Sequence, residues 1–335
     1  MKILPRGVAF CGMVFCLSLC CLTACKKDAR STSLKEASCC AAYQHSDPLL
    51  DQPLPGVTRL AIGGDSRDDH VGVVPWAFKE AGRRGAKAFF FLGDLELTPA
   101  EDELFLRKLP DLGNVLFYPA MGNHEIETLG FVRMPESESR QRVKEFKDRF
   151  VKAHDVKLAD IADAVAYSAD LEGGIHLIAL DNVSRKGEGF GSEQLKWLAA
   201  DLDAASAAKK IILVGMHKGL AKNPVTTHAM DEDGPSAIQD SDTALALFKK
   251  YKVAMVFVSH SHMYAAYNQD GLEVRLTGGL GAPLVKGLSE ANGGFHHFLL
   301  VDIPRAASNT PLLVQVVKFP GPPTKDDKNE SEEIE

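Results

Sequence analysis

The sequence predicts an α/β fold with a parallel sheet, because strand-like and helix-like segments alternate along the chain. Apolar runs at residues 58–63, 86–92 and 115–120 are typical of buried strands. Helical patterns at about 72–84 and 100–109 separate these runs, which gives a β-α-β-α-β succession. Strands joined in this way are usually neighbours in one sheet, so we expect these three to be parallel and adjacent.

Polar residues follow each of the three predicted strands. Asp65, Asp94 and Asn123 come at regular intervals of 29 residues. The carboxyl ends of parallel strands meet at one edge of a sheet, where α/β proteins gather their binding residues. Each residue also has a simpler interpretation, a helix cap at Asp65, a turn residue at Asp94 and a loop amide at Asn123. Their convergence favours a shared site, to which His124 adds an imidazole and Glu125 a carboxylate.

Two further predicted strands end at histidines. The run 210–216 leads to His217, and the run 253–258 leads to His260 and His262. Histidines at positions i and i+2 can face one site only if the backbone turns, which a loop after a strand permits. Paired histidines in such a loop indicate a metal site.

The other segments complete the α/β pattern. We expect a charged helix within 135–154, a hairpin of strands at 165–168 and 175–180, a helix around Gln194 to Leu198 and a helix near 241–251. Short β-like runs between residues 265 and 318 predict completion of a second sheet.

Four features of these segments bear on function. The long loop 218–239 is expected to be a substrate-facing flap, and His228 within it is either a site residue or a solvent-facing one. His176, on an alternating strand, is interpreted as a hydrogen-bonded core histidine. The glycine-rich turn 277–283 either lets backbone N–H groups approach an anion or is a plain turn.

Composition excludes some classes of function. The formal net charge of -7 argues against a nucleic-acid scaffold. All seven cysteines precede residue 41, so a metal in the folded part must be held by Asp, Asn, Glu or His. That donor set suits Mn, Fe or Zn better than soft metals.

The amino terminus predicts export and lipidation. Lys2 and Arg6 precede an apolar run at residues 7–24, which is typical of a secretory signal, although an uncleaved anchor has a similar length. Leu22-Thr23-Ala24-Cys25 resembles the lipobox of bacterial lipoproteins, which implies cleavage after residue 24 and membrane attachment through lipidated Cys25. We therefore expect a lipid-anchored protein of the cell envelope, periplasmic or on the outer surface. A polar tether at 25–56, a folded domain at 57–319 and a disordered acidic tail at 320–335 would follow.

The polar motifs together resemble the calcineurin-like metallophosphoesterases, the superfamily that includes purple acid phosphatases. The resemblance is carried by Asp65, Gly93-Asp94, Gly122-Asn123-His124-Glu125, His217 and His260-Ser261-His262. It implies a four-layer α/β/β/α sandwich with two mixed β-sheets, and a site holding two divalent metal ions. The implied metal ligands are Asp65, Asp94, Asn123, His217, His260 and His262. Asp94 would bridge the metals, Asp65 and His262 would serve the first, and the remaining three would serve the second.

The resemblance also implies how the site works. His124 would bind the substrate or protonate the leaving oxygen, with Glu125 supporting it. Two cations would neutralise a small-molecule phosphoester and activate a water for in-line attack.

The first motif departs from the family pattern. The usual Asp-x-His is Asp65-Ser66-Arg67 here, and the Tyr that purple acid phosphatases supply after the bridging Asp is Leu97. The first metal site is thus poorer by one ligand. Arg67 either binds substrate phosphate, offsets a missing metal or pairs with Asp68 or Asp69, and His70 is a possible substitute ligand.

The predicted function is therefore an extracytoplasmic, metal-dependent phosphoesterase. The incomplete first site leaves a non-catalytic, metal-binding lipoprotein as the alternative, and adhesion through the acidic tail as a third possibility.

Overall fold

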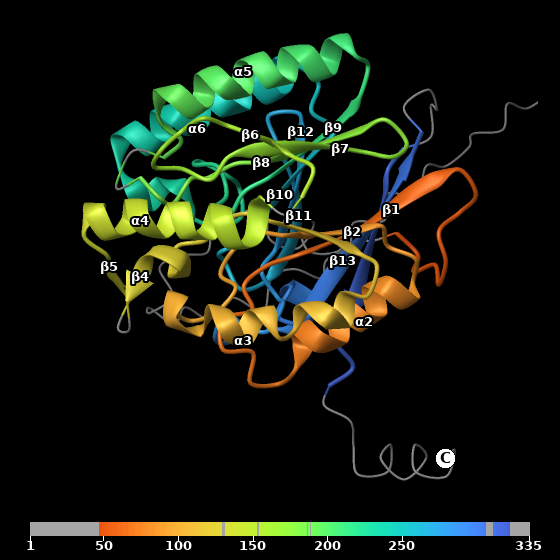
Figure 1. The fold of residues 1–335 in the computed structure, drawn as a ribbon. Coiled ribbons are helices and arrows are strands. Elements are labelled where there is room, and N and C mark those ends of the chain that lie inside the picture. The colour runs from red at the N-terminus through yellow and green to blue at the C-terminus, as the bar shows by residue number, and fades with distance from the viewer. Residues whose placement is uncertain are drawn as a thin grey trace, which may run out of the picture. The chain divides into compact units, whose positions relative to one another are not determined.

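Two mixed sheets pack face to face between helices in the computed structural model (Figure 1). It describes residues 47–128, 131–152, 154–185, 187, 189–305 and 311–321, all within the compact unit Ser33–Glu335. The predicted signal peptide, most of the tether and nearly all of the acidic tail lie outside the described residues. No helix in the described ranges is both long and apolar enough to cross a membrane.

The first sheet carries the three strands predicted to be parallel neighbours. Its spatial order is β14 (Leu313–Lys318), β13 (His297–Pro304), β1 (Val57–Gly63), β2 (Ala88–Phe91) and β3 (Leu116–Pro119). β1, β2 and β3 are mutually parallel, with Ile62 beside Phe90 and Phe90 beside Tyr118. The prediction that their carboxyl ends share one edge is confirmed.

The second sheet carries the two strands that end at histidines. Its order is β11 (Tyr264–Gln269), β12 (Leu272–Thr277), β10 (Met255–Val258), β9 (Ile211–Gly215), β8 (Ile175–Ala179), β7 (Tyr167–Leu171) and β6 (Lys157–Leu158). β9 and β10 are parallel, and β7 and β8 form the predicted antiparallel hairpin. A separate hairpin of β4 (Glu127–Thr128) and β5 (Val132–Arg133), which the sequence did not predict, follows the third strand end.

Two expectations about the carboxyl-terminal half were wrong. The strands after residue 265 do not all join the second sheet, because β13 pairs antiparallel with β1 and carries β14 with it into the first. The helix expected near 241–251 begins six residues earlier, at Pro235, which shortens the predicted flap. Proline at the first helical position has its φ already set for the helix and lacks an N–H that would go unpaired there.

The helices pack around the two sheets. They are α2 (Val73–Arg83), α3 (Asp102–Leu106), α4 (Glu136–Phe146), α5 (Gly191–Ala207) and α6 (Pro235–Lys250). Short 3-10 segments are η1 (Pro99–Glu101), η2 (Leu109–Leu112), η3 (His124–Ile126), η5 (Met230–Asp233) and η6 (Glu290–Asn292), and η4 (Lys147–Val151) is a π-helical turn. Figure 1 shows α2 and α3 on one side of the sheets and α5 and α6 on the other.

Two apolar cores hold these layers together. One contains side chains from both sheets and α2, including Ile62, Phe78, Phe90, Leu213 and Phe257. The other lies between the second sheet and the helices α5 and α6. The arrangement is the predicted four-layer α/β/β/α sandwich.

His176 is a core histidine, as the sequence suggested. Its ring is 7 % exposed, with Nδ1 2.8 Å from Asp170 Oδ1 and Nε2 2.8 Å from Asp201 Oδ2. Burial alone would lower the pKa of His176, but the hydrogen bonds to Asp201 and Asp170 outweigh it and raise the pKa above 6.5. The charged ring thus ties β8 to α5.

This raised pKa predicts a pH-dependent contribution to stability. It should be fully present below the ordinary histidine pKa of about 6.5 and be lost as pH rises through the higher folded-state pKa. Urea unfolding of His176→Gln against the wild type should give a difference in unfolding free energy that narrows above neutral pH. The exposed His70→Gln serves as the control. A difference for His176→Gln that stays constant with pH would contradict a charged imidazole.

Candidate metal centre

The loops after β1, β2 and β10 hold predicted site residues in a left-handed backbone conformation. Asp65 has φ 62°, Asp94 has φ 58° and His260 has φ 68°. Such conformations cost residues other than glycine about 1–3 kcal/mol each and cluster at functional sites. The positive φ of His260 also turns the backbone, which His260 and His262 need in order to face the same site. Asp65 does not cap α2, since Asp69 accepts the N–H groups of Val73 and Val74.

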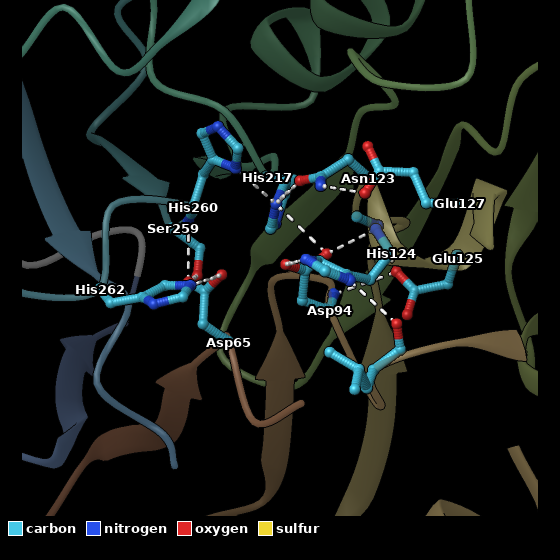
Figure 2. A network of polar contacts seen from close by, with 12 residues as sticks. Asp65, Asp94, Asn123, His124, Glu125, Glu127, His217, Ser259, His260 and His262 are labelled. Atoms are coloured by element: carbon cyan, nitrogen blue, oxygen red, sulfur yellow. Dashed lines mark hydrogen bonds and ion pairs between the residues drawn. The ribbon is translucent and has the colours of Figure 1, made fainter. Parts of the chain in front are cut away.

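Asp65 and His262 form the first group of facing atoms (Figure 2). Asp65 Oδ2 accepts hydrogen bonds from the His260 N–H at 2.8 Å and from the Ser259 hydroxyl. Asp65 Oδ1 is buried and has no donor among the described residues. His262 Nδ1 donates to the Pro283 carbonyl at 2.7 Å, so its Nε2 carries the lone pair when the ring is neutral. That Nε2 faces Asp65 Oδ1 at 3.6 Å, which places two acceptors opposite each other.

His217 is the centre of the second group. Its Nδ1 donates to the Leu92 carbonyl at 2.8 Å, which leaves the lone pair of the neutral ring on Nε2. Nε2 lies 2.9 Å from Asn123 Oδ1 and 3.4 Å from Asp94 Oδ1. The Asn123 amide is oriented by donating from Nδ2 to Glu127 at 3.2 Å, so its oxygen is the atom turned towards His217. Three acceptor atoms therefore face one another here, namely His217 Nε2, Asn123 Oδ1 and Asp94 Oδ1.

His260 completes the second group. Its Nδ1 lies 3.1 Å from His217 Nε2, and its ring stacks on that of His228 with centroids 4.0 Å apart. Burial lowers the pKa of His260 well below 6.5, so this ring is neutral. Its Nε2 lies 3.6 Å from Glu232, which also contacts His228. His228 therefore borders the site through its contact with His260.

The acceptor-rich arrangement fits divalent cations. Asp65, Asp94 and His217 each offer a ligand atom within 4.8 Å of the others, and all three are buried. Burial raises the pKa of Asp65 to about 6. Burial would also raise that of Asp94, but the positive charges of His217 and His124 in their protonated forms lower it to about 2. A proton on His217 Nε2 would remove the repulsion between facing acceptors in the second group only. A cation in each group would remove it in both.

His124 lies next to Asp94, and a hydrogen bond to the backbone orients its ring. Its Nδ1 donates to the Leu97 carbonyl at 2.9 Å, and its Nε2 lies 3.7 Å from Asp94 Oδ2. The Leu97 position, where the purple acid phosphatase motif has Tyr, thus contributes a backbone carbonyl. His124 Nε2 is the ring atom available to exchange a proton.

Glu125 lies beneath the site and contacts the backbone. Its carboxylate accepts N–H groups from Asp94 at 3.0 Å, Leu95 at 2.8 Å and Gly122 at 2.6 Å. The side chain is 2 % exposed, so it has no face open to a substrate. Burial and the Asp94 charge raise the pKa of Glu125 to about 8, while the three N–H donors favour its carboxylate form.

Arg67 has none of the acidic partners that the sequence suggested. Among the described residues Asp68 pairs with His70 and Asp69 caps α2, so neither holds the guanidinium. The Arg67 guanidinium carbon lies 5.2 Å from the ring centroid of Phe131, and its buried Nε has no described partner. The His70 side chain is 77 % exposed and belongs to neither group of candidate metal ligands among the described residues.

Sequence reasoning missed several contacts of the site. Glu127 orients Asn123, Glu232 contacts both His228 and His260, and Phe131 lies against Arg67. Glu127 lies four residues after Asn123 in the same loop, which is the one local signal. In the turn 277–283, the N–H groups of residues 280 and 282 bond the carbonyls of Gly64 and Asp65, which supports a structural turn.

Comparison with known proteins agrees with this fold. The sequence profile of the calcineurin-like phosphoesterase family matches residues 67–264, more than half of the chain. A search of curated proteins found no significant match. The fold is similar to that of a purple acid phosphatase from yellow lupin (Lupinus luteus) seeds, with a TM-score of 0.58 and 19 % identity over 79 % of this chain and 52 % of that one. The chain thus spans about half the length of the lupin enzyme.

A second solved structure is similar along its whole length. It is a dimetal phosphatase from Danio rerio, with a TM-score of 0.50 and 12 % identity over 78 % of this chain and 99 % of that one. At these identities the structural likenesses speak for the fold alone, whereas the profile match speaks for the family. The chain belongs to the calcineurin-like phosphoesterase family.

Proposed function

We propose that this protein is a metal-dependent phosphoesterase that hydrolyses small-molecule phosphomonoesters or phosphodiesters at a dinuclear centre. The observation that carries the proposal is the pair of acceptor groups described above. Asp65 Oδ1 faces a histidine lone pair, and His217 Nε2 faces two oxygens. Buried acceptors that lack donors are costly, and cations between them remove that cost.

The proposed ligands follow from these two groups. Asp65 and His262 would hold the first divalent ion, and Asn123, His217 and His260 would hold the second. Asp94 would serve both, because Oδ1 lies towards His217 and its carboxylate shares the 4.8 Å cluster with Asp65. Oxygen and imidazole donors suit Mn, Fe or Zn.

His124 would handle the proton of the leaving group. When bound, the two cations would neutralise the phosphoester and acidify a water. The hydrogen bond to Leu97 keeps one proton on His124 Nδ1, so protonated Nε2 would donate to the leaving oxygen as the phosphorus–oxygen bond breaks. Arg67, which has no acidic partner among the described residues, would bind a phosphate oxygen. Glu125 would be a positioning residue.

A non-catalytic metal-binding role is the second candidate. Of the described residues, the first group contains Asp65 and His262 alone, with Asp94 shared from the second group, and the His that the family places beside them is Arg67 here. A chain that binds metal at the second group alone would hold one ion and lack turnover.

Substitution of Asp94 separates these two candidates. In Asp94→Ala, metal content should fall from about two equivalents per chain to less than one, with loss of phosphoesterase activity on a chromogenic substrate. Asp270→Ala is the matched control, because Asp270 has φ 52° but lies in an exposed turn outside the site. Elemental analysis and circular dichroism would measure metal and fold. One tightly held ion and no turnover in the wild type would overturn the proposal.

Substitution of His124 tests its proton transfer. His124→Asn should lower kcat about 10²- to 10⁴-fold for an alkyl phosphate, whose leaving oxygen needs a proton. The loss should be much smaller for 4-nitrophenyl phosphate, and metal content should not change. His154→Asn, at a half-buried ring packed on Tyr118, is the control. Equal losses for both substrates would contradict the acid role.

We also propose that the protein is anchored in the cell envelope through Cys25, on the strength of its lipobox-like sequence. In a bacterial host given labelled palmitate, the wild type should carry label and sediment with membranes. Cys25→Ala should lose both properties, and Cys39→Ala should keep them. Label and membrane association retained by Cys25→Ala would refute lipidation at this residue.

A further inference from the structure

Phe131 is an exposed aromatic residue at the edge of the proposed active site. Its side chain is 59 % exposed, among the highest values for the large apolar residues of the described ranges. Single exposed apolar residues are common and need no explanation by themselves. Phe131 differs because it contacts two residues to which the proposed reaction assigns the phosphate and the leaving group.

The first contact is with Arg67. The guanidinium carbon lies 5.2 Å from the Phe131 ring centroid, within the range of a cation–π interaction. This contact covers part of the ring and helps to orient the guanidinium. More than half of the side chain stays accessible, so holding Arg67 does not use the whole ring.

The second contact is with His124. The two ring centroids lie 5.3 Å apart with an interplanar angle of 90°. Since His124 Nε2 would protonate the leaving oxygen, the open part of Phe131 borders the space that the leaving group would enter. A ring bonded directly to that oxygen would lie beside Phe131, and aromatic pairs attract at centroid separations of about 4.5–7 Å.

The backbone holds Phe131 in this position at a cost. Its φ is 60°, a left-handed value that is rare for a bulky residue. The Phe131 N–H donates to the Thr128 carbonyl at 3.1 Å, in the turn that joins β4 to β5. Thr128 pairs with Val132 in that hairpin, which begins just after the loop of Asn123 and His124. The Phe131 ring therefore lies on the chain segment that directly follows Asn123 and His124.

We infer that Phe131 selects phosphoesters of phenolic alcohols, by packing against the aromatic ring of the leaving group. The inference rests on the proposed phosphoesterase function and adds the class of substrate. An alkyl leaving group would leave the ring exposed to water, whereas a phenolic one would cover it. Arg67 and His124 would contact the phosphate end, and Phe131 the aromatic end.

Kinetics with two substrates test this inference. Phe131→Leu should lower kcat/KM for phenyl phosphate by about 2- to 10-fold, the range expected for loss of one aromatic pair. It should lower kcat/KM for ethyl phosphate by a smaller factor, because that substrate loses only the effect of Phe131 on Arg67. Phe131→Tyr, which retains the ring, should restore the preference, and Val132→Ala should behave as the wild type. An equal loss for both substrates would mean that Phe131 acts only through Arg67, and would overturn the inference.

A binding measurement separates this inference from the proposed function. Phenylphosphonate should bind the metal-loaded protein more tightly than ethylphosphonate, and Phe131→Leu should reduce that preference by the same factor as in the kinetics. An inactive wild type that keeps this binding preference would refute catalysis and support the aromatic contact. Equal binding of the two phosphonates by the wild type would overturn the inference whether or not the protein is active.

Discussion

The buried carboxylate of Glu125 joins the two loops on which the site depends. It accepts N–H groups from Asp94 and Leu95 after β2 and from Gly122 after β3. A buried carboxyl group needs hydrogen-bond partners in place of water, so these three hydrogen bonds and the close approach of the two loops depend on each other. A Cβ at Gly122 would lie 2.3 Å from the Asp94 nitrogen, so only glycine lets the loops approach this closely. Asp94 and the Asn123 that follows Gly122 thereby keep a constant separation.

The second physical constraint is the contact between the two sheets at their carboxyl ends. His217 follows β9 in the second sheet, yet its Nδ1 donates to the carbonyl of Leu92, which follows β2 in the first. The two sheets can approach this closely because residue 215 is glycine. A Cβ there would lie 2.1 Å from the Phe90 ring. The contact with Leu92 determines that Nε2 of the neutral His217 ring carries the lone pair. That nitrogen thereby becomes one of a set of facing acceptors, the arrangement that favours cations.

The errors made from the sequence have separate physical origins. Pairing of β13 with β1 joins residues about 240 positions apart, and the local period of apolar residues does not identify a partner strand. The early start of α6 was missed because Pro235 was counted with the loop residues around it, although proline is favoured in the first turn of a helix. The β4–β5 hairpin pairs only two residues on each strand, too few for a periodic pattern, so the position of Phe131 could not be anticipated.

Local chemistry in the sequence was sufficient for the fold class, the order of β1, β2 and β3, and the polar residues that end each strand. Strand and helix periodicity depends on neighbours in the chain, and parallel crossovers bring successive strand ends to one edge. The tertiary structure alone decided that Asp69 rather than Asp65 caps α2, that neither Asp68 nor Asp69 pairs with Arg67, and that the Arg67 guanidinium lies over Phe131. Those outcomes depend on contacts between side chains that compete for the same partners, and the competition is resolved only when the chain is folded.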